Sequence, residues 1–379
     1  MNGSGKIACA AVLASAALVA LNGASAENLT GETRKLLAAA KLDPAVLKGL
    51  DKELAVPAAM VEAAKKEGKV RVQLTLSAIE FAKTSQVFQA RYPGIEVEYS
   101  RGIGPQTQKA LVAVRTGNLI TDVIGTYDSR LDEFHKAGLL KVSDLPAYAS
   151  LRDDMRTPSG VDAADKLNYW CTTYSTERVD KANLPKRWDD LLTIPAWRNG
   201  RLALATNAGQ TFLPTLAIKL GDAWAENFLT KLFNEVKPQL RKETLAATGK
   251  LIAVGEFDLV LAIQDYVTER DALKGIPVAA HCPEPVVAAW GKLGIFKDTP
   301  YPNAARLYVN WHISKEGQIA NYQYGRQVPV HAALDSREFM PYPEEIIGKQ
   351  ILYRTDDVLA GQRRIISLWR KYWEGAGGN

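Results

Sequence analysis

Apolar and polar residues alternate over 70–76, and this pattern predicts a half-buried β-strand. Residues 79–91 have helical periodicity, and the Tyr-Pro-Gly run at 92–94 ends that helix. A second alternating strand follows over 95–99. Together the three elements form a β-α-β unit, which predicts an open α/β sheet.

The second strand runs into a glycine turn and then into a new helix that begins near Pro105. In open α/β sheets, ligands bind at the carboxyl ends of strands, where such turns direct helix N-termini toward them. Arg101 and Gly102 lie in this turn. We therefore expect both residues to contact a ligand.

Strands and helices continue to alternate along the chain, with further strands predicted over 122–125, 167–176, 201–205 and 257–263. Between the third of these and the next helix lies Gly209-Gln210-Thr211. Two roles fit this helix start: its backbone amides hold an anion, or the turn only caps the helix.

The chain has 379 residues, of which 47% are apolar and 23% charged, as in ordinary globular proteins. This length exceeds one typical hydrophobic core and predicts two lobes. We expect lobe one over 60–175, completed by segments after about 290. We expect lobe two over 176–289, completed by C-terminal helices at 345–379. The basic residues behind the net charge of +5 are dispersed, so no nucleic-acid partner is indicated.

Residues 1–26 carry one cation, Lys6, then an apolar run over 7–21 and the ending Ala24-Ser25-Ala26. This is the pattern of a cleaved signal peptide, and it predicts an exported, periplasmic protein that begins at Glu27. A membrane anchor is the alternative, but an anchor needs about 20 apolar residues.

Residues 27–59 form an N-terminal helical extension with two predicted helices, over 31–41 and 43–54. Asp43-Pro44 is a favourable start for the second. The extension is interpreted as a clasp packed on one lobe, with a partner-docking module as the alternative.

Cys171 and Cys282 remain after export. In an oxidising compartment they can form a disulfide, and two separate buried thiols are the alternative. The four histidines have no metal-ligand spacing, and no nucleophile elbow, Walker loop or complete dinucleotide fingerprint is present. An enzyme is therefore disfavoured, and no cofactor is required.

Several motifs occur in an order that resembles a known family. They are the AAKKEGKV run at 63–70, the YPGI run at 92–95, the tryptophan-bearing block at 185–200, YPNAA at 301–305 and SKEGQ at 314–318. The chain thus resembles, from about 61 to 329, the periplasmic solute-binding proteins of ABC importers, specifically the ferric-ion-binding branch. The resemblance implies a type II periplasmic binding fold, in which two lobes, each a mixed sheet flanked by helices, are joined by crossover hinge strands.

The same resemblance implies the site and the partners. Fe³⁺ would bind between the lobes with a synergistic anion at the 209–211 turn, and a monomer would deliver it to an inner-membrane permease. The implied iron ligands are Tyr127, Asp128, Asp265 and Tyr266, and Tyr174 is a further recruited tyrosine. Ser77 occupies the place of the histidine ligand that some members have, and the second of the paired tyrosines is also missing.

A small organic anion, carboxylate or phosphonate, is the alternative ligand. Arg101, the two helix starts and Tyr266 would hold it. A periplasmic sensor subunit would use the same fold, and the sequence does not separate it from an importer subunit.

Overall fold

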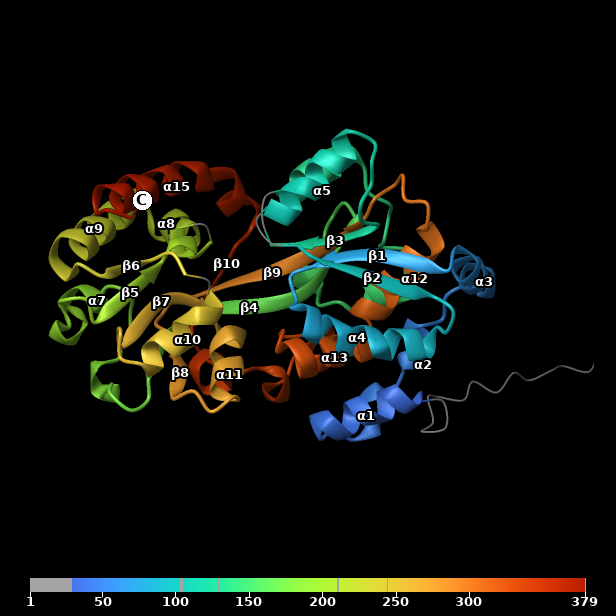
Figure 1. The fold of residues 1–379 in the computed structure, drawn as a ribbon, viewed down its shortest axis with the longest axis horizontal. Helices are drawn as coiled ribbons and strands as arrows, with labels where there is room; N and C mark the ends of the chain where they lie inside the picture. Colours follow the sequence, from blue (N-terminus) through green and yellow to red (C-terminus); the bar gives the residue numbers. More distant parts are fainter. Residues whose placement is uncertain (1–28, 103–104, 128–129, 210, 244, 379) are drawn as a thin grey trace, which may run out of the picture.

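Two long strands, β4 (Asp162–Ser175) and β9 (Val286–Ile295), pair antiparallel through the middle of the molecule and join two lobes (Figure 1). The computed structural model describes residues 29–378 apart from 103–104, 128–129, 210 and 244. The signal peptide expected over 1–26 therefore lies outside the described residues, as do Asp128 and Gln210.

One mixed sheet runs through both lobes in the order β2-β1-β3-β9-β4-β7-β5-β6, with β10 against β9 and β8 against β4. The other strands that the structure describes are β1 (Lys69–Leu74), β2 (Glu96–Arg101), β3 (Val123–Thr126), β5 (Leu202–Ala205), β6 (Gln239–Arg241), β7 (Leu259–Gln264), β8 (Val278–His281) and β10 (Ile351–Tyr353). The predicted α/β fold with crossover strands is confirmed.

Lobe one has helices on both faces of β1, β2 and β3. Val123 of β3 belongs to the core beneath one helix layer, whereas Ile124 packs with Phe134 and Phe296 beneath the other. This alternation follows from the two-residue period of a strand. The helices of this lobe are α3 (Ala58–Glu67), α4 (Ala78–Arg91), α5 (Pro105–Arg115), α6 (Arg130–Ala137), α12 (Pro302–Ile313) and α13 (Lys315–Gly325).

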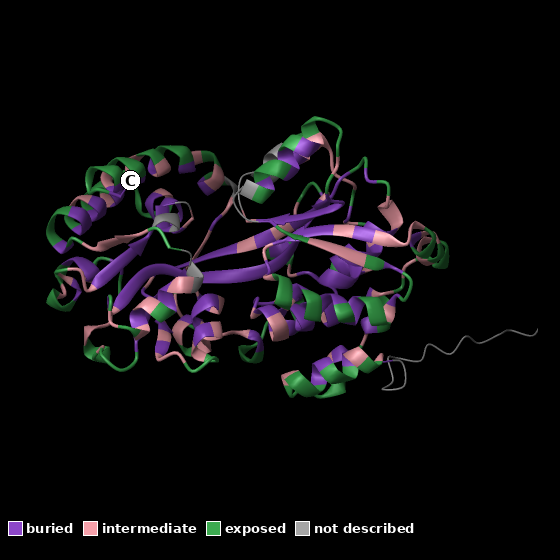
Figure 2. Ribbon diagram, viewed as in Figure 1, coloured by how far each residue is buried: buried purple, intermediate pink, exposed green. Residues whose placement is uncertain are grey.

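Lobe two repeats the same layering around β5 and β7. Leu204 and Leu261 face one core, and Ala203 and Val260 face the other. Figure 2 shows the strands of both lobes as buried and the outer helix faces as exposed. The helices of this part are α7 (Asp190–Thr193), α8 (Phe212–Leu220), α9 (Asp222–Lys231), α10 (Leu245–Ala253), α11 (Asp265–Ala272) and α15 (Asp356–Gly375), whereas α14 (Pro343–Ile346) buries Ile346 in the lobe-one core. The C-terminal helix α15 packs on lobe two through Trp369 and Trp373.

The N-terminal extension packs on lobe one. Leu36 and Leu37 of α1 (Gly31–Ala40) are buried in the lobe-one core, and the Thr33 hydroxyl donates to Glu316 at 2.5 Å. The single helix expected over 43–54 is wrong, because Gly49 has a positive φ of 86° and splits it. A 3₁₀ turn (Pro44–Leu47) precedes this glycine, and α2 (Leu50–Glu53) follows it.

β4 begins at Asp162, five residues before the start of the predicted strand, and every residue of it is buried. The first part of β4 was not predicted because it contains charged residues, which are typical of a surface segment. In the structure Asp165 and Lys166 are buried and pair with each other at 2.8 Å. Cys171 of this strand forms a disulfide with Cys282. Within the residues that the structure describes, every helix is too short or too polar to span a membrane.

Candidate functional site

Three strand ends from the two lobes meet at the centre of the molecule. In lobe one, β1 leads to α4 through Ser77, and β3 leads to Tyr127. In lobe two, β7 leads directly to α11, whose first residues are Asp265 and Tyr266. The region formed by Ser77, Glu80, Arg101, Tyr127, Asp265, Tyr266 and Arg270 is called the lobe junction below.

Ser77 begins α4 with a capping box. Its hydroxyl accepts from the Glu80 amide at 3.4 Å, and its own amide donates to Glu80 Oε2 at 2.8 Å. The other oxygen of Glu80 pairs with Arg270 of α11, which belongs to lobe two. Ser77 thus orders the helix start, and its capping partner holds the opposite lobe.

A second ion pair also links the lobes. Arg326, which ends α13, binds Glu269 of α11 at 2.5 Å, and Arg270 is the next residue along that helix. Both partners are mostly buried, since their side chains are 18% and 13% exposed. Helix α11 is therefore tied to lobe one by two neighbouring ion pairs.

Tyr127 lies against the crossover strand. Its hydroxyl donates to Asn168, and Gln327 lies 3.2 Å away. The ammonium of Lys166 is 5.0 Å from the centre of the Tyr127 ring. Burial raises the pKa of the Tyr127 phenol well above its ordinary value, and the neighbouring Tyr266 raises it further.

Tyr266 stacks against Arg270, whose guanidinium lies 4.9 Å from the ring centre. Burial raises the pKa of the Tyr266 phenol, whereas Arg270 and Arg101 lower it. Two phenols from opposite lobes and two guanidinium groups are thus within electrostatic range of one another. The buried Nε of Arg270 has no hydrogen-bond partner within the described chain.

Asp265 is fully buried beside Tyr266. Its Oδ1 accepts from the Tyr169 amide at 3.2 Å, and its Oδ2 has no hydrogen-bond partner among the described residues. Burial raises the pKa of this carboxyl to about 8. At neutral pH it is therefore mainly protonated and can donate a hydrogen bond.

The raised pKa of Asp265 predicts a pH dependence of stability. The folded protein keeps this proton up to about pH 8, whereas the unfolded chain releases it near the ordinary value of 3.8. The carboxyl therefore favours folding at low pH, and this contribution is lost as the pH rises between those values. We expect Asp265→Asn to lose less stability than the wild type between about pH 5 and about pH 8, as measured by urea denaturation. Parallel profiles for the two proteins would contradict the buried, protonated state.

The other residues predicted to bind the ligand, Arg101, Gly102 and Tyr174, differ in how far they are buried and in what they contact. Arg101 is exposed at the end of β2 and has no hydrogen bond or ion pair to any described residue. Gly102 is buried, and its amide donates to the Leu74 carbonyl at 2.7 Å. Tyr174 is in the lobe-two core opposite Leu259, at the start of β7. It is thus at the far end of β7 from Asp265, roughly 20 Å along the strand.

The second helix start lies beneath α15. A Cβ placed on Gly209 would lie 2.1 Å from Trp369, so only glycine fits there. Thr211 precedes α8 without a side-chain capping bond. Within the described ranges, no group of three or more His, Cys, Asp and Glu side chains is placed to hold a metal. The oxygen groups at the lobe junction are the phenols of Tyr127 and Tyr266, the carboxyl of Asp265 and the Glu80 carboxylate that pairs with Arg270.

Sequence reasoning missed Arg270, Glu80, Glu269 and Arg326. Two of them carried a signal: Ser77 and Glu80 have capping-box spacing, and Arg270 is one helical turn after Tyr266. No pattern in the sequence pairs Arg326 with Glu269, because 57 positions separate them.

The profile of the bacterial extracellular solute-binding proteins matches residues 83–344, more than half of the chain. The chain belongs to this family. Comparison of the solute-binding protein with the curated proteins finds no match.

Solved structures with the same fold bind different ligands. Iron-bound HitA from Pseudomonas aeruginosa has a TM-score of 0.60 and 22% identity, and the match covers 78% of this chain and 99% of that one. An ABC-transporter substrate-binding protein from Agrobacterium tumefaciens has a TM-score of 0.68 and 16% identity, with 82% and 96% covered. AfuA from Actinobacillus pleuropneumoniae, with fructose-6-phosphate bound, has a TM-score of 0.62 and 17% identity, with 80% and 98% covered. These likenesses establish the fold of the solute-binding protein, not its ligand.

Proposed function

We propose that this solute-binding protein works in the periplasm as the substrate-binding subunit of an ABC importer. It captures a small organic anion at the lobe junction and delivers it to an inner-membrane permease. The observation that supports an anion is the presence of two guanidinium groups near Tyr266: Arg270 stacks on its ring, and Arg101 is near enough to lower the pKa of its phenol. A carboxylate or phosphonate group is the chemistry that arginine recognises best.

The other groups at the junction are also donors. The Tyr127 and Tyr266 phenols keep their protons because burial raises both pKa values. The protonated Asp265 adds a third hydroxyl, and its Oδ2 has no partner among the described residues. Arg270 is neutralised by Glu80, but Arg101 has no ion pair to any described residue. Neutral donors beside this uncompensated cation favour a negatively charged ligand over a cation.

Binding should close the lobes, because these groups come from both sides. Arg101 and Tyr127 belong to lobe one, whereas Asp265, Tyr266 and Arg270 belong to lobe two. A ligand that contacts both sets stabilises the closed arrangement. We expect solution scattering to show a smaller radius of gyration at saturating ligand than without it. An unchanged curve would contradict a hinged binding protein.

Ferric iron with a synergistic anion is the second candidate. The observation in its favour is that Tyr127 and Tyr266 are phenols from opposite lobes, near enough for Tyr266 to raise the pKa of Tyr127. Ionised phenols are strong ligands for Fe³⁺, and the anion would lie at the amides of Gly209 and Thr211. Iron bound to HitA, a protein of the same fold, is consistent with this candidate. Against it, burial raises the pKa of both phenols, and the Arg270 cation that stacks on Tyr266 would repel Fe³⁺.

The Tyr266→Phe variant separates the two candidates. It removes the hydroxyl and keeps the ring that packs on Arg270, so folding should be preserved. If an organic anion is the ligand, the wild type stays colourless with ferric citrate, and the variant binds the anion roughly tenfold more weakly through loss of one hydrogen bond. A wild type that turns coloured, and loses the colour in Tyr266→Phe, would establish the iron candidate instead.

A further inference from the structure

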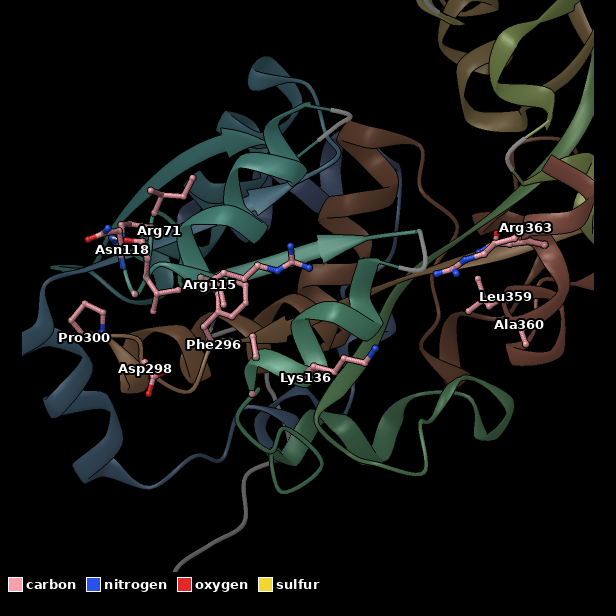
Figure 3. A pocket seen from close by; sticks show the side chains of 17 residues that line it. Arg71, Arg115, Asn118, Lys136, Phe296, Asp298, Pro300, Leu359, Ala360 and Arg363 are labelled. Atoms are coloured by element: carbon pink, nitrogen blue, oxygen red, sulfur yellow. Dashed lines mark hydrogen bonds between the residues drawn. The ribbon is translucent and has the colours of Figure 1, made fainter. Parts of the chain in front are cut away.

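A groove of about 1210 Å³ runs between lobe one and α15 (Figure 3). Lobe one contributes the ends of α5 and α6 together with Phe296, and α15 contributes Leu359, Ala360 and Arg363. None of the residues assigned above to the lobe junction lines this groove. It is therefore a separate feature that the proposed transport site does not explain.

Cations from both lobes point into this groove. Figure 3 shows Arg115 and Lys136 extending toward α15, and Arg363 extending back toward them. Lys136 and Arg363 are exposed, and neither has an ion pair within the described chain. Asp298 is the carboxylate among the described lining residues, and it lies at the other end of the groove (Figure 3).

Lys136 and Arg363 differ from two nearby arginines, which form ion pairs. Arg71, at the far end of the same groove, binds Asp122 at 2.6 Å. Arg364, the next residue along α15, pairs with Asp222. The unpaired charges of Lys136 and Arg363 are thus concentrated where the two lobes face each other.

A smaller pocket of about 430 Å³ adjoins the groove and shares Leu359 and Ala360 with it. It adds the ammonium of Lys292, which has no ion pair to any described residue. His135 also lines this pocket, but its Nε2 lies 2.7 Å from the buried carboxylate of Asp162, so we do not count it among the cations open to a ligand. The positive lining therefore extends beyond the groove along the crossover strand β9.

Like charges that face each other across a groove repel, and low-dielectric walls strengthen the field between them. Phe296 and Leu359 supply such apolar walls. An anion between the cations removes the repulsion. Because the cations come from separate elements, an anion with several charged groups can contact more of them than a simple ion can.

We propose that this groove is a second binding site, for a multivalent small anion of the polyphosphate or polycarboxylate class. Such an anion bridges Lys136 of lobe one and Arg363 of α15, with Lys292 as a further contact. Because α15 packs on lobe two, an anion bound here joins the lobes at a place separate from the transported ligand.

The site is tested at constant ionic strength by isothermal titration of the full-length mature protein with tripolyphosphate, and of its Arg101→Ala variant, which lacks the lobe-junction cation, with citrate. We expect saturable one-to-one binding that Lys136→Gln and Arg363→Gln each weaken by roughly fivefold, the upper range for a partly exposed charge pair. The matched control is Arg370→Gln, which removes the same charge from an exposed position of α15 outside the groove. It should bind like the wild type.

Three results would overturn the proposal. The first is no saturable binding of either probe. The second is an equal loss in Arg363→Gln and Arg370→Gln, which would mean non-specific attraction to a basic surface. The third is loss of binding in Arg101→Ala with full binding in Arg363→Gln, which would place the probe at the lobe junction. A failure of the proposed transport function would leave these titrations unchanged, because the lobe junction and the groove share no residue.

Discussion

Replacing Arg101 by alanine is expected to weaken binding of the organic anion by roughly a hundredfold, the loss typical of a charge-assisted contact enclosed on binding. Arg101 is exposed in the structure and has no described partner, so the substitution removes a group that is available to a ligand. It should not change the free energy of unfolding, since no buried contact is lost. Equilibrium titration of the ligand together with urea denaturation measures both quantities.

Lys109→Ala is the matched control for this prediction. Lys109 is an exposed cation on α5, the helix that follows β2, and its loss lowers the net charge by the same amount. The control should bind the ligand like the wild type. If Arg101→Ala binds only a few times more weakly, Arg101 does not hold the anion, and Arg270 becomes the main cation of the site.

Glu316→Ala is expected to destabilise the protein by about 3–5 kcal/mol, the cost of leaving a buried charge without its partner. The Glu316 carboxylate is fully buried at the start of α13 and accepts two hydrogen bonds from Arg91, at 2.5 and 2.6 Å. It also accepts from Thr33 of the N-terminal extension and from the Trp311 indole, at 2.5 and 2.8 Å. One carboxylate thus joins α1, α4 and α12.

Urea denaturation of the variant measures this loss. Glu62→Ala serves as the control, because Glu62 forms an exposed pair with Lys65 and its side chain is 64% exposed. The control should change stability very little. Equal stability of Glu316→Ala and the wild type would show that the buried ion pair contributes nothing to the folded state and that the extension is held by its apolar contacts alone.

The fold could be predicted from the sequence because its signals are local. The alternation over 70–76 and the Tyr-Pro-Gly ending of α4 are visible without any partner, and both correspond to observed elements. The start of β4 could not be predicted, since Asp165 and Lys166 look like surface residues until their pairing inside the protein is known. The break at Gly49 was not predicted, because a single glycine inside a helical pattern is often tolerated and its positive φ is visible only in the structure.

The site was predictable only in part. Tyr127 and Tyr266 could be named because the resemblance to the ferric-ion-binding proteins implies ligands at these positions, and the structure places them close enough for Tyr266 to raise the pKa of Tyr127. Arg270 and Arg326 act through contacts with residues of the other lobe, which no local pattern reveals. Which residues contact the ligand stays a prediction, and two of the predicted residues, Asp128 and Gln210, lie outside the described residues. Tyr174, in contrast, belongs to the lobe-two core, away from the lobe junction.

Native mass spectrometry of the mature protein tests the central claim most directly. The protein is incubated with ferric chloride and a mixture of small monocarboxylates and monophosphonates, and the mass of the bound species is read before and after denaturation. The account predicts one metal-free organic anion per chain, released on denaturation and absent from Arg101→Ala. An adduct that contains iron, or no adduct at all, would contradict it.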